Sequence, residues 1–299
     1  MSVFDVPIDH VCLNNGVKMP LVGLGTYPFQ KKAVYQLIET AYDLGYRSFD
    51  TAWLYKNEID IGAALKDLGV PRNEVFLTSK IHIDSLYWPR YYYSLSFGGL
   101  KYKSVYTAYR DSCRRLGVDY LDLYLIHWPF PGYLKMWKEM TKLYDNKLVR
   151  AIGVSSFMPS HLDSLKDVSP IVPMVNQIEM NPYNSRQDVV DYCKMHGILV
   201  EAYSPLGRGV YTKDLLSDSV ISDIAANHSV STAQVIVRWF VQRGIVAVPR
   251  TNKRTKLFQN ISVFDFSLSD LEMRGIDGLN RDLFIKGDSR DVGIDGRNN

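Results

Sequence analysis

The chain has 299 residues, of which 46% are hydrophobic and 22% charged, and this ordinary globular composition excludes a fibrous or wholly disordered protein. The formal net charge is only +3, which is too small for a basic nucleic-acid-binding or anionic-membrane-binding surface. The three cysteines, Cys12, Cys113 and Cys193, lack disulfide-framework or metal-ligand spacing. No segment approaches the roughly 18 apolar residues of a membrane-spanning helix. We therefore expect a cytoplasmic protein without a metal, whose partner is a small molecule.

The first predicted element is a short β-hairpin. Asn14-Asn15-Gly16 separates two brief extended runs at 11–13 and 18–20, and an Asn-Gly pair supplies the positive φ angles of a tight turn.

After the hairpin, the apolar pattern alternates between strand and helix periods. The predicted strands cover 21–25, 47–50, 74–80, 121–127, 149–155, 174–179, 199–203 and 245–248. The predicted helices cover 33–41, 58–68, 104–116, 133–146, 160–167, 186–196, 231–242, 253–261 and 269–279. Eight strand–helix units with largely apolar strands predict an α/β fold, a (β/α)8 TIM barrel that occupies the whole chain as one domain. A doubly wound sheet would need a glycine-rich phosphate turn, which the glycines at 23 and 25 do not complete.

One segment interrupts this alternation at about 83–101. It contains Trp88 and three consecutive tyrosines at 91–93. A connection of this length is usually functional, and its aromatic content argues against disorder. We therefore expect an extended aromatic loop beside the end of the third strand.

Ionisable residues gather at the ends of the predicted strands, where barrel enzymes hold their active sites. Asp50, Lys80 and His127 end strands two to four, and Tyr55 follows shortly after Asp50. A tyrosine has a pKa near 10; an adjacent ammonium would lower that pKa, and a carboxylate would keep the ammonium charged. Such a phenol can donate a proton to an oxygen that gains negative charge, and the imidazole can orient that oxygen.

Each of these residues also has a purely structural explanation. Asp50 could cap the next helix, Tyr55 could serve in packing, Lys80 could be a solvated strand end, and His127 could be a core histidine. Their joint arrangement favours a site. Because we find no nucleophile–base pair or metal cage, another group must supply the electrons.

The chain resembles the aldo-keto reductase family in a series of segments that follow the family order. They are GLGT at 23–26, FDTAWLYKNEIDIG at 49–62, SK at 79–80, LYLIHWP at 124–130, IGVSSF at 152–157, NQIEMNP at 176–182, EAYSPLG at 201–207 and VPRTNKRTKLFQN at 248–260. The resemblance implies reduction of aldehydes and ketones by NADPH, with Asp50, Tyr55, Lys80 and His127 as the catalytic tetrad. Tyr55 is the implied proton donor, and the nicotinamide supplies the hydride.

The resemblance also implies a cofactor site across the barrel mouth. Ser155 and Gln177 would hold the nicotinamide carboxamide, and Tyr203 would stack on its ring. Arg250 and its neighbours suit the 2′-phosphate of NADPH. This stretch has no acidic residue that would bind the ribose hydroxyl of NADH instead. The implied cofactor contacts are Gly25, Thr26, Asp50, Ser155, Ser156, Gln177, Tyr203, Ser204, Leu206, Arg250, Thr251, Lys256, Gln259 and Asn260. The implied substrate wall consists of Tyr27, Leu54, Trp88 and Trp128.

Two other functions remain open from the residues alone. A barrel hydrolase could use Glu179 and Glu201 as a carboxylate pair, although this leaves the basic stretch after the last strand unexplained. A regulator could bind the nicotinamide without catalysis and present the aromatic loop to a protein partner. The oligomeric state is also open, and a monomer is expected.

Overall fold

The computed structural model describes residues 9–82 and 104–285. The aromatic loop expected at 83–101, with Trp88 and the tyrosines at 91–93, lies outside the described residues. In the described part of the chain, no helix has both the length and the apolar character needed to cross a membrane. That all 299 residues form one domain stays a prediction.

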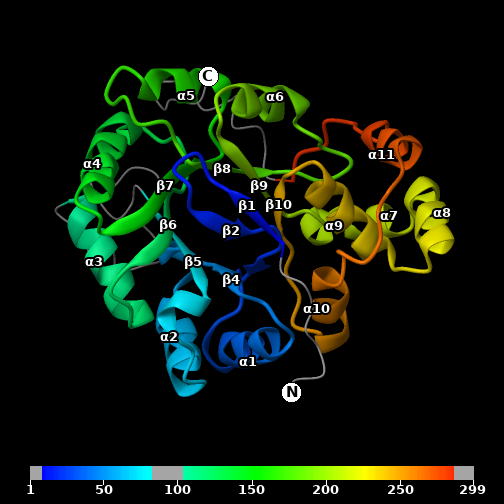
Figure 1. Ribbon diagram of the computed structural model, residues 1–299, viewed down its shortest axis with the longest axis horizontal. Helices are drawn as coiled ribbons and strands as arrows, with labels where there is room; N and C mark the ends of the chain where they lie inside the picture. The colour runs from blue at the N-terminus through cyan, green and yellow to red at the C-terminus, as the bar shows by residue number, and fades with distance from the viewer. Residues whose placement is uncertain (1–8, 83–103, 286–299) are drawn as a thin grey trace.

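Eight parallel strands follow one another around a barrel, as predicted (Figure 1). They are β3 (Leu24–Gly25), β4 (Ser48–Asp50), β5 (Phe76–Ile81), β6 (Leu121–Ile126), β7 (Val149–Ser155), β8 (Val175–Glu179), β9 (Leu199–Tyr203) and β10 (Val246–Val248). The first and last strands meet where Val22 and Ala247 form a parallel bridge, and the Ala247 N–H donates to the Leu21 carbonyl at 3.0 Å. The predicted (β/α)8 fold is therefore confirmed.

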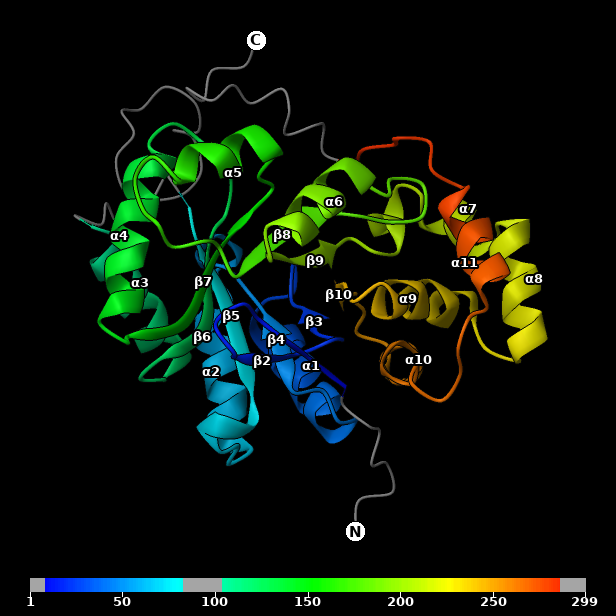
Figure 2. The same ribbon diagram turned by 45° about the horizontal axis from the view of Figure 1, so that its top comes forward.

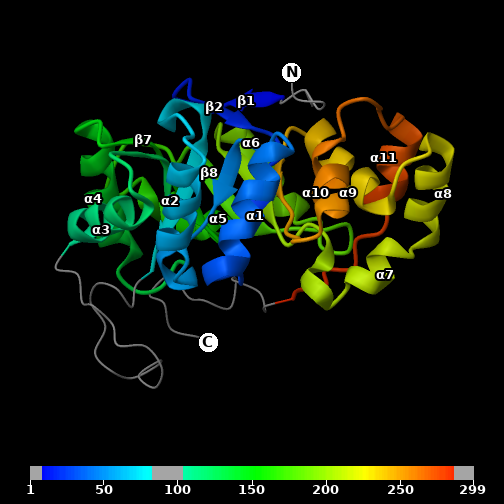
Figure 3. The same cartoon turned by 90° about the horizontal axis from the view of Figure 1, so that it is seen from below.

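The predicted hairpin is also confirmed. Strand β1 (His10–Cys12) pairs antiparallel with β2 (Lys18–Pro20), and Gly16 in the turn has a φ of 84°, which glycine adopts without steric cost. The Asn14 amide donates hydrogen bonds of 3.2 and 3.1 Å to carbonyl oxygens in the segments that lead into β8 and β9. The hairpin therefore lies at the end of the barrel where the strands begin (Figure 3).

Helices surround the barrel (Figure 2). They are α1 (Lys31–Asp43), α2 (Glu58–Asp67), α3 (Val105–Leu116), α4 (Tyr133–Asp145), α5 (Pro159–Leu165), α6 (Gln187–Met195), α7 (Thr212–Leu216), α8 (Ser219–His228), α9 (Thr232–Gln242), α10 (Arg254–Ile261) and α11 (Asp270–Asp277), with single turns η1 (Trp53–Tyr55), η2 (Arg72–Glu74) and η4 (Gly207–Gly209). In α1, the apolar positions Val34, Leu37, Ile38 and Ala41 are all buried. Burying such a stripe contributes roughly 1.5–3 kcal/mol for each large side chain, which explains why the helical period predicts these elements.

The predicted elements omit α7 and α8, which lie between β9 and α9. A start signal for α8 is present, because the Asp218 carboxylate accepts a 3.0 Å hydrogen bond from the Val220 N–H. Ile221 and Ile224 are buried at helical spacing behind it. The five residues of α7 are too few for periodicity to reveal.

Candidate active site

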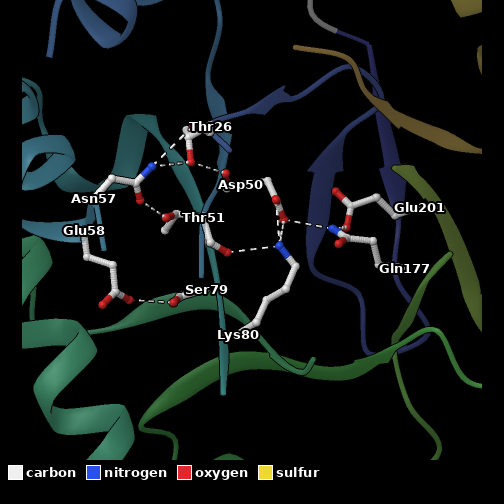
Figure 4. Close-up of polar contacts among 9 residues, drawn as sticks. All are labelled: Thr26, Asp50, Thr51, Asn57, Glu58, Ser79, Lys80, Gln177 and Glu201. Atoms are coloured by element: carbon white, nitrogen blue, oxygen red, sulfur yellow. Dashed lines mark hydrogen bonds and ion pairs between the residues drawn. The ribbon is translucent and has the colours of Figure 1, made fainter. Parts of the chain in front are cut away.

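The strongest polar contact of the barrel interior joins Lys80 and Asp50. The Lys80 ammonium donates to the two Asp50 carboxylate oxygens at 2.6 and 2.5 Å and to the Thr51 carbonyl at 3.0 Å (Figure 4). Lys80 is 0% exposed and Asp50 5% exposed. Burial acts to lower the pKa of Lys80, but the Asp50 charge acts against it and the pKa is raised overall. The lysine is therefore charged, as the sequence predicts.

Tyr55 and His127 complete the expected tetrad. The Lys80 nitrogen lies 5.2 Å from the centre of the Tyr55 ring. The centres of the Tyr55 and His127 rings are 5.7 Å apart, with an angle of 76° between the ring planes. The fold thus brings together all four side chains, which come from β4, η1, β5 and the end of β6.

The pKa of Tyr55 differs from the sequence prediction in its net direction. Burial raises it, because a phenolate loses hydration inside the protein, and the Lys80 charge lowers it without reversing the rise. The predicted effect of Lys80 is correct, but the prediction of a lowered pKa is wrong. Tyr55 consequently keeps its proton near neutral pH, which is the form that a proton donor requires.

The loop that carries Tyr55 is anchored by the buried side chain of Asn57. The Thr51 hydroxyl donates to Asn57 Oδ1 at 2.6 Å, and the Asn57 amide donates to the Thr26 hydroxyl at 3.2 Å (Figure 4). Thr26 in turn donates to the Asp50 carbonyl at 2.8 Å. This network ties the segment after β3 to the segment after β4, and it occupies the hydroxyl of Thr26, a residue that the resemblance assigns to the cofactor site.

Gln177 connects the tetrad to the next part of the mouth. Its amide nitrogen donates to Asp50 Oδ2 at 2.8 Å and to Glu201 Oε2 at 2.7 Å (Figure 4). Both amide hydrogens are therefore committed, which leaves the amide oxygen as an acceptor. Ser155 is paired in register with Gln177 and ends β7. A hydroxyl beside an amide oxygen is a donor and acceptor set that fits the carboxamide of a nicotinamide.

Tyr203 lies at the end of β9 with its ring half-buried. Its hydroxyl is 3.4 Å from the Ser156 hydroxyl. Ser156 has a φ of 63°, in the left-handed region that residues other than glycine seldom adopt. The turn after β7 thus places a hydroxyl where it holds the Tyr203 ring at the mouth.

Two arginines, Arg208 and Arg250, follow the last two strands of the barrel. Arg250 follows β10, and partial burial together with the Arg208 charge lowers its pKa. The Arg208 guanidinium carbon is 4.9 Å from the centre of the Tyr27 ring. Within residues 9–82 and 104–285, neither guanidinium forms an ion pair. Two neighbouring cations of this kind are a site for phosphate groups, so the residues present fit a pyridine dinucleotide.

The comparisons with known proteins agree with this geometry. The family model of the aldo/keto reductase family matches residues 21–281. The chain belongs to this family. It is 41% identical over 276 residues to glyoxal reductase of Bacillus subtilis, which covers 92% of this chain and 94% of the relative.

Solved structures of the aldo-keto reductase family have the same fold. A reductase from a Medee basin deep-sea metagenome superimposes with a TM-score of 0.84 at 37% identity and covers 93% of this chain and 97% of its own. A point variant of Gox0644 in complex with NADPH superimposes with a TM-score of 0.84 at 35% identity and covers 95% of this chain and 98% of its own.

The other residues that the resemblance assigns to an aldo-keto reductase cofactor site differ in exposure. Asn260 is 3% exposed on α10. Leu206 and Thr251 are half-buried, and Lys256 is exposed. The remaining members are Gly25 at the end of β3, Ser204 with a φ of 57°, and the half-buried Gln259.

The described part of the expected substrate wall is apolar and aromatic. Tyr27 is 40% exposed and Leu54 39% exposed, and Trp128 stacks on Phe130 with ring centres 6.2 Å apart. Trp88 lies outside the described residues.

The sequence prediction missed His82 and Arg208. The His82 ring centre is 5.7 Å from that of His127. His82 had a signal, because it lies two positions after Lys80 and residues two apart on a strand share a face. Arg208 lies in the turn η4, where the strand period gives no signal.

The two carboxylates of the hydrolase alternative have different hydrogen-bond partners in the structure. Glu179 accepts a 2.7 Å hydrogen bond from the Ile285 N–H, whereas Glu201 receives the Gln177 amide. Membership of the aldo/keto reductase family decides against the hydrolase.

Proposed function

We propose that this chain reduces the carbonyl group of an aldehyde or ketone with NADPH and that Tyr55 donates the proton. The observation that carries the proposal is the buried Lys80–Asp50 pair beside the Tyr55 ring, with His127 across from it. The NADPH complex of the related Gox0644 supports the cofactor. The similarity to glyoxal reductase supports a carbonyl substrate.

Bound NADPH would supply a hydride to the carbonyl carbon. The carbonyl oxygen would lie between Tyr55 and His127, where the imidazole orients it. Tyr55 would transfer its proton as negative charge develops on that oxygen. The Lys80 ammonium would stabilise the phenolate that remains, while Asp50 keeps the ammonium charged and in place. Because Lys80 and Asp50 are buried, water screens their charges only weakly.

The cofactor would lie across the mouth from β7 to β10. Ser155 and the Gln177 amide oxygen would hold the carboxamide, and the Tyr203 ring would stack on the nicotinamide. Arg208 and Arg250 would bind phosphate groups. Bound phosphate would also offset the Arg208 charge that lowers the pKa of Arg250.

We expect Arg250→Ala to weaken NADPH binding about 10- to 100-fold, because a hydrogen bond to a charged group contributes roughly 1.5–3 kcal/mol. NADH lacks the 2′-phosphate, so its dissociation constant should change much less. Titration of both cofactors against the wild type and the variant measures this, with Arg250→Lys as the charge-conserving control. Equal losses for the two cofactors would remove the assignment of Arg250 to the 2′-phosphate.

The proposed reaction is tested by NADPH consumption with a panel of aldehydes, ketones and sugars. Turnover with at least one class of carbonyl compound is expected. If the cofactor binds and no carbonyl compound accelerates its oxidation, the nicotinamide-binding regulator becomes the better explanation.

We also propose a cytoplasmic location, which the three free cysteines support. A monomer stays a prediction, as does the absence of nucleic-acid partners.

A further inference from the structure

Glu201 lies deep in the barrel beside the proposed proton-donating machinery. It is the third residue of β9 and is 0% exposed. One oxygen, Oε2, accepts a 2.7 Å hydrogen bond from the Gln177 amide. The other, Oε1, is buried without a hydrogen-bond partner among the described residues. No step of the proposed reaction uses this carboxyl group.

The two carboxyl groups around Gln177 are held very differently. Asp50 receives both Lys80 contacts and one hydrogen of the Gln177 amide. Glu201 receives only the other hydrogen of that amide (Figure 4). A buried carboxylate with one neutral donor is far more costly than a buried carboxylic acid. One ammonium therefore balances one carboxylate, and the second carboxyl group is stable in its neutral form.

We propose that Glu201 is a positioning residue that acts on Tyr55 through Gln177, Asp50 and Lys80, and that its carboxyl group is protonated when the enzyme is active. This inference rests on the proposed function. The neutral acid fixes the Gln177 amide against Asp50 without adding charge to the cluster. Loss of its proton to solvent would place a second negative charge near Lys80, and this charge would oppose formation of the Tyr55 phenolate.

The charged surroundings of Glu201 agree with this role. Burial and then the Asp50 charge raise its pKa to about 8, while the Gln177 hydrogen bond and the Lys80 charge lower it. Asp50 also raises the pKa of Tyr55. A second carboxylate in the same cluster would also raise the pKa of Tyr55. The titratable groups whose charges act on Glu201 are thus Asp50 and Lys80, and Tyr203 shares β9 with Glu201.

The test compares Glu201→Gln, Glu201→Leu and wild type in the pH dependence of kcat/KM for carbonyl reduction. A glutamine imitates the neutral acid and keeps the acceptor for Gln177, whereas a leucine removes it. We expect Glu201→Gln to stay active at pH 6.5 and to move the alkaline fall in activity upward by about one pH unit. Glu201→Leu should be slower at every pH. An alkaline fall at the same pH in Glu201→Gln and wild type would overturn the proposal.

A second measurement does not depend on catalysis. A carboxyl group whose folded pKa lies above its unfolded value binds a proton more tightly when folded, so it makes the protein lose stability as the pH rises between the two values. We expect the midpoint of thermal unfolding to fall less between pH 5 and 8 in Glu201→Gln than in wild type. Equal falls would contradict a protonated Glu201, even if the Tyr55 mechanism is correct.

Glu58→Gln is the matched control for the pH dependence of kcat/KM. Glu58 is a second buried acid, on the far side of β5, where it accepts a 2.7 Å hydrogen bond from Ser79 (Figure 4). Burial raises its pKa as well. If Glu58→Gln moved the alkaline fall and Glu201→Gln did not, the assignment to Glu201 would be wrong.

Discussion

Replacing Tyr55 by phenylalanine is expected to slow carbonyl reduction by about 100- to 10,000-fold, the range that a general acid contributes. Phenylalanine keeps the ring that contacts His127 and lies near Lys80 and removes only the hydroxyl. NADPH affinity should therefore stay close to that of the wild type. Single-turnover oxidation of bound NADPH with a saturating aldehyde measures the effect.

Tyr106→Phe is the control for this substitution. Tyr106 is 50% exposed on α3, so losing its hydroxyl should leave turnover unchanged. A Tyr55→Phe variant with undiminished turnover and normal NADPH binding would show that another group donates the proton.

Replacing Lys80 by methionine is expected to destabilise the fold by about 3–5 kcal/mol, the cost of leaving one member of a buried ion pair without its partner. Asp50 would keep only the Gln177 hydrogen bond. The double variant Lys80→Met with Asp50→Asn carries no buried charge at these positions and should regain most of the lost stability. Both the single and the double variant should lack activity, because Tyr55 would lack the ammonium that stabilises its phenolate. Urea unfolding and turnover separate the two effects.

The pH dependence of stability distinguishes the variants further. In wild type the raised pKa of Lys80 contributes stability that is complete below the unfolded pKa of about 10.4 and is lost as the pH rises through the folded value. Methionine at position 80 does not titrate, so the single variant should lack this alkaline loss of stability. An equal loss in the single variant and in wild type as the pH rises above about 10.4 would contradict its assignment to Lys80.

The barrel was predictable because its signals are local and repeated. An apolar period predicts each strand and most helices. Parallel strands also bring their carboxyl ends to the same end of the barrel. Asp50 and Lys80 could therefore be placed together from their positions alone. The short α7 and the omitted α8 show where too few residues carry the period.

The finer features of the site depend on opposing effects of burial, charge and hydrogen bonding between residues that are distant in sequence. The apolar pattern of the sequence does not contain this information. The net pKa of Tyr55 is decided by burial against the Lys80 charge. The direction of the Gln177 amide is decided by two carboxyl groups from different strands. The approach of Arg208 to Arg250 joins the turn after β9 to the turn after β10. None of these balances can be inferred from one residue and its neighbours in sequence.

Transfer of deuterium from NADPH labelled at the reactive nicotinamide position is the most direct test of hydride transfer by this protein. After incubation of the purified protein with labelled NADPH and an aldehyde, mass spectrometry of the alcohol locates the label. We expect one deuterium on the former carbonyl carbon in wild type and a rate at least about 100-fold lower in Tyr55→Phe. Alcohol without deuterium, or no alcohol despite bound cofactor across the whole carbonyl panel, would contradict it.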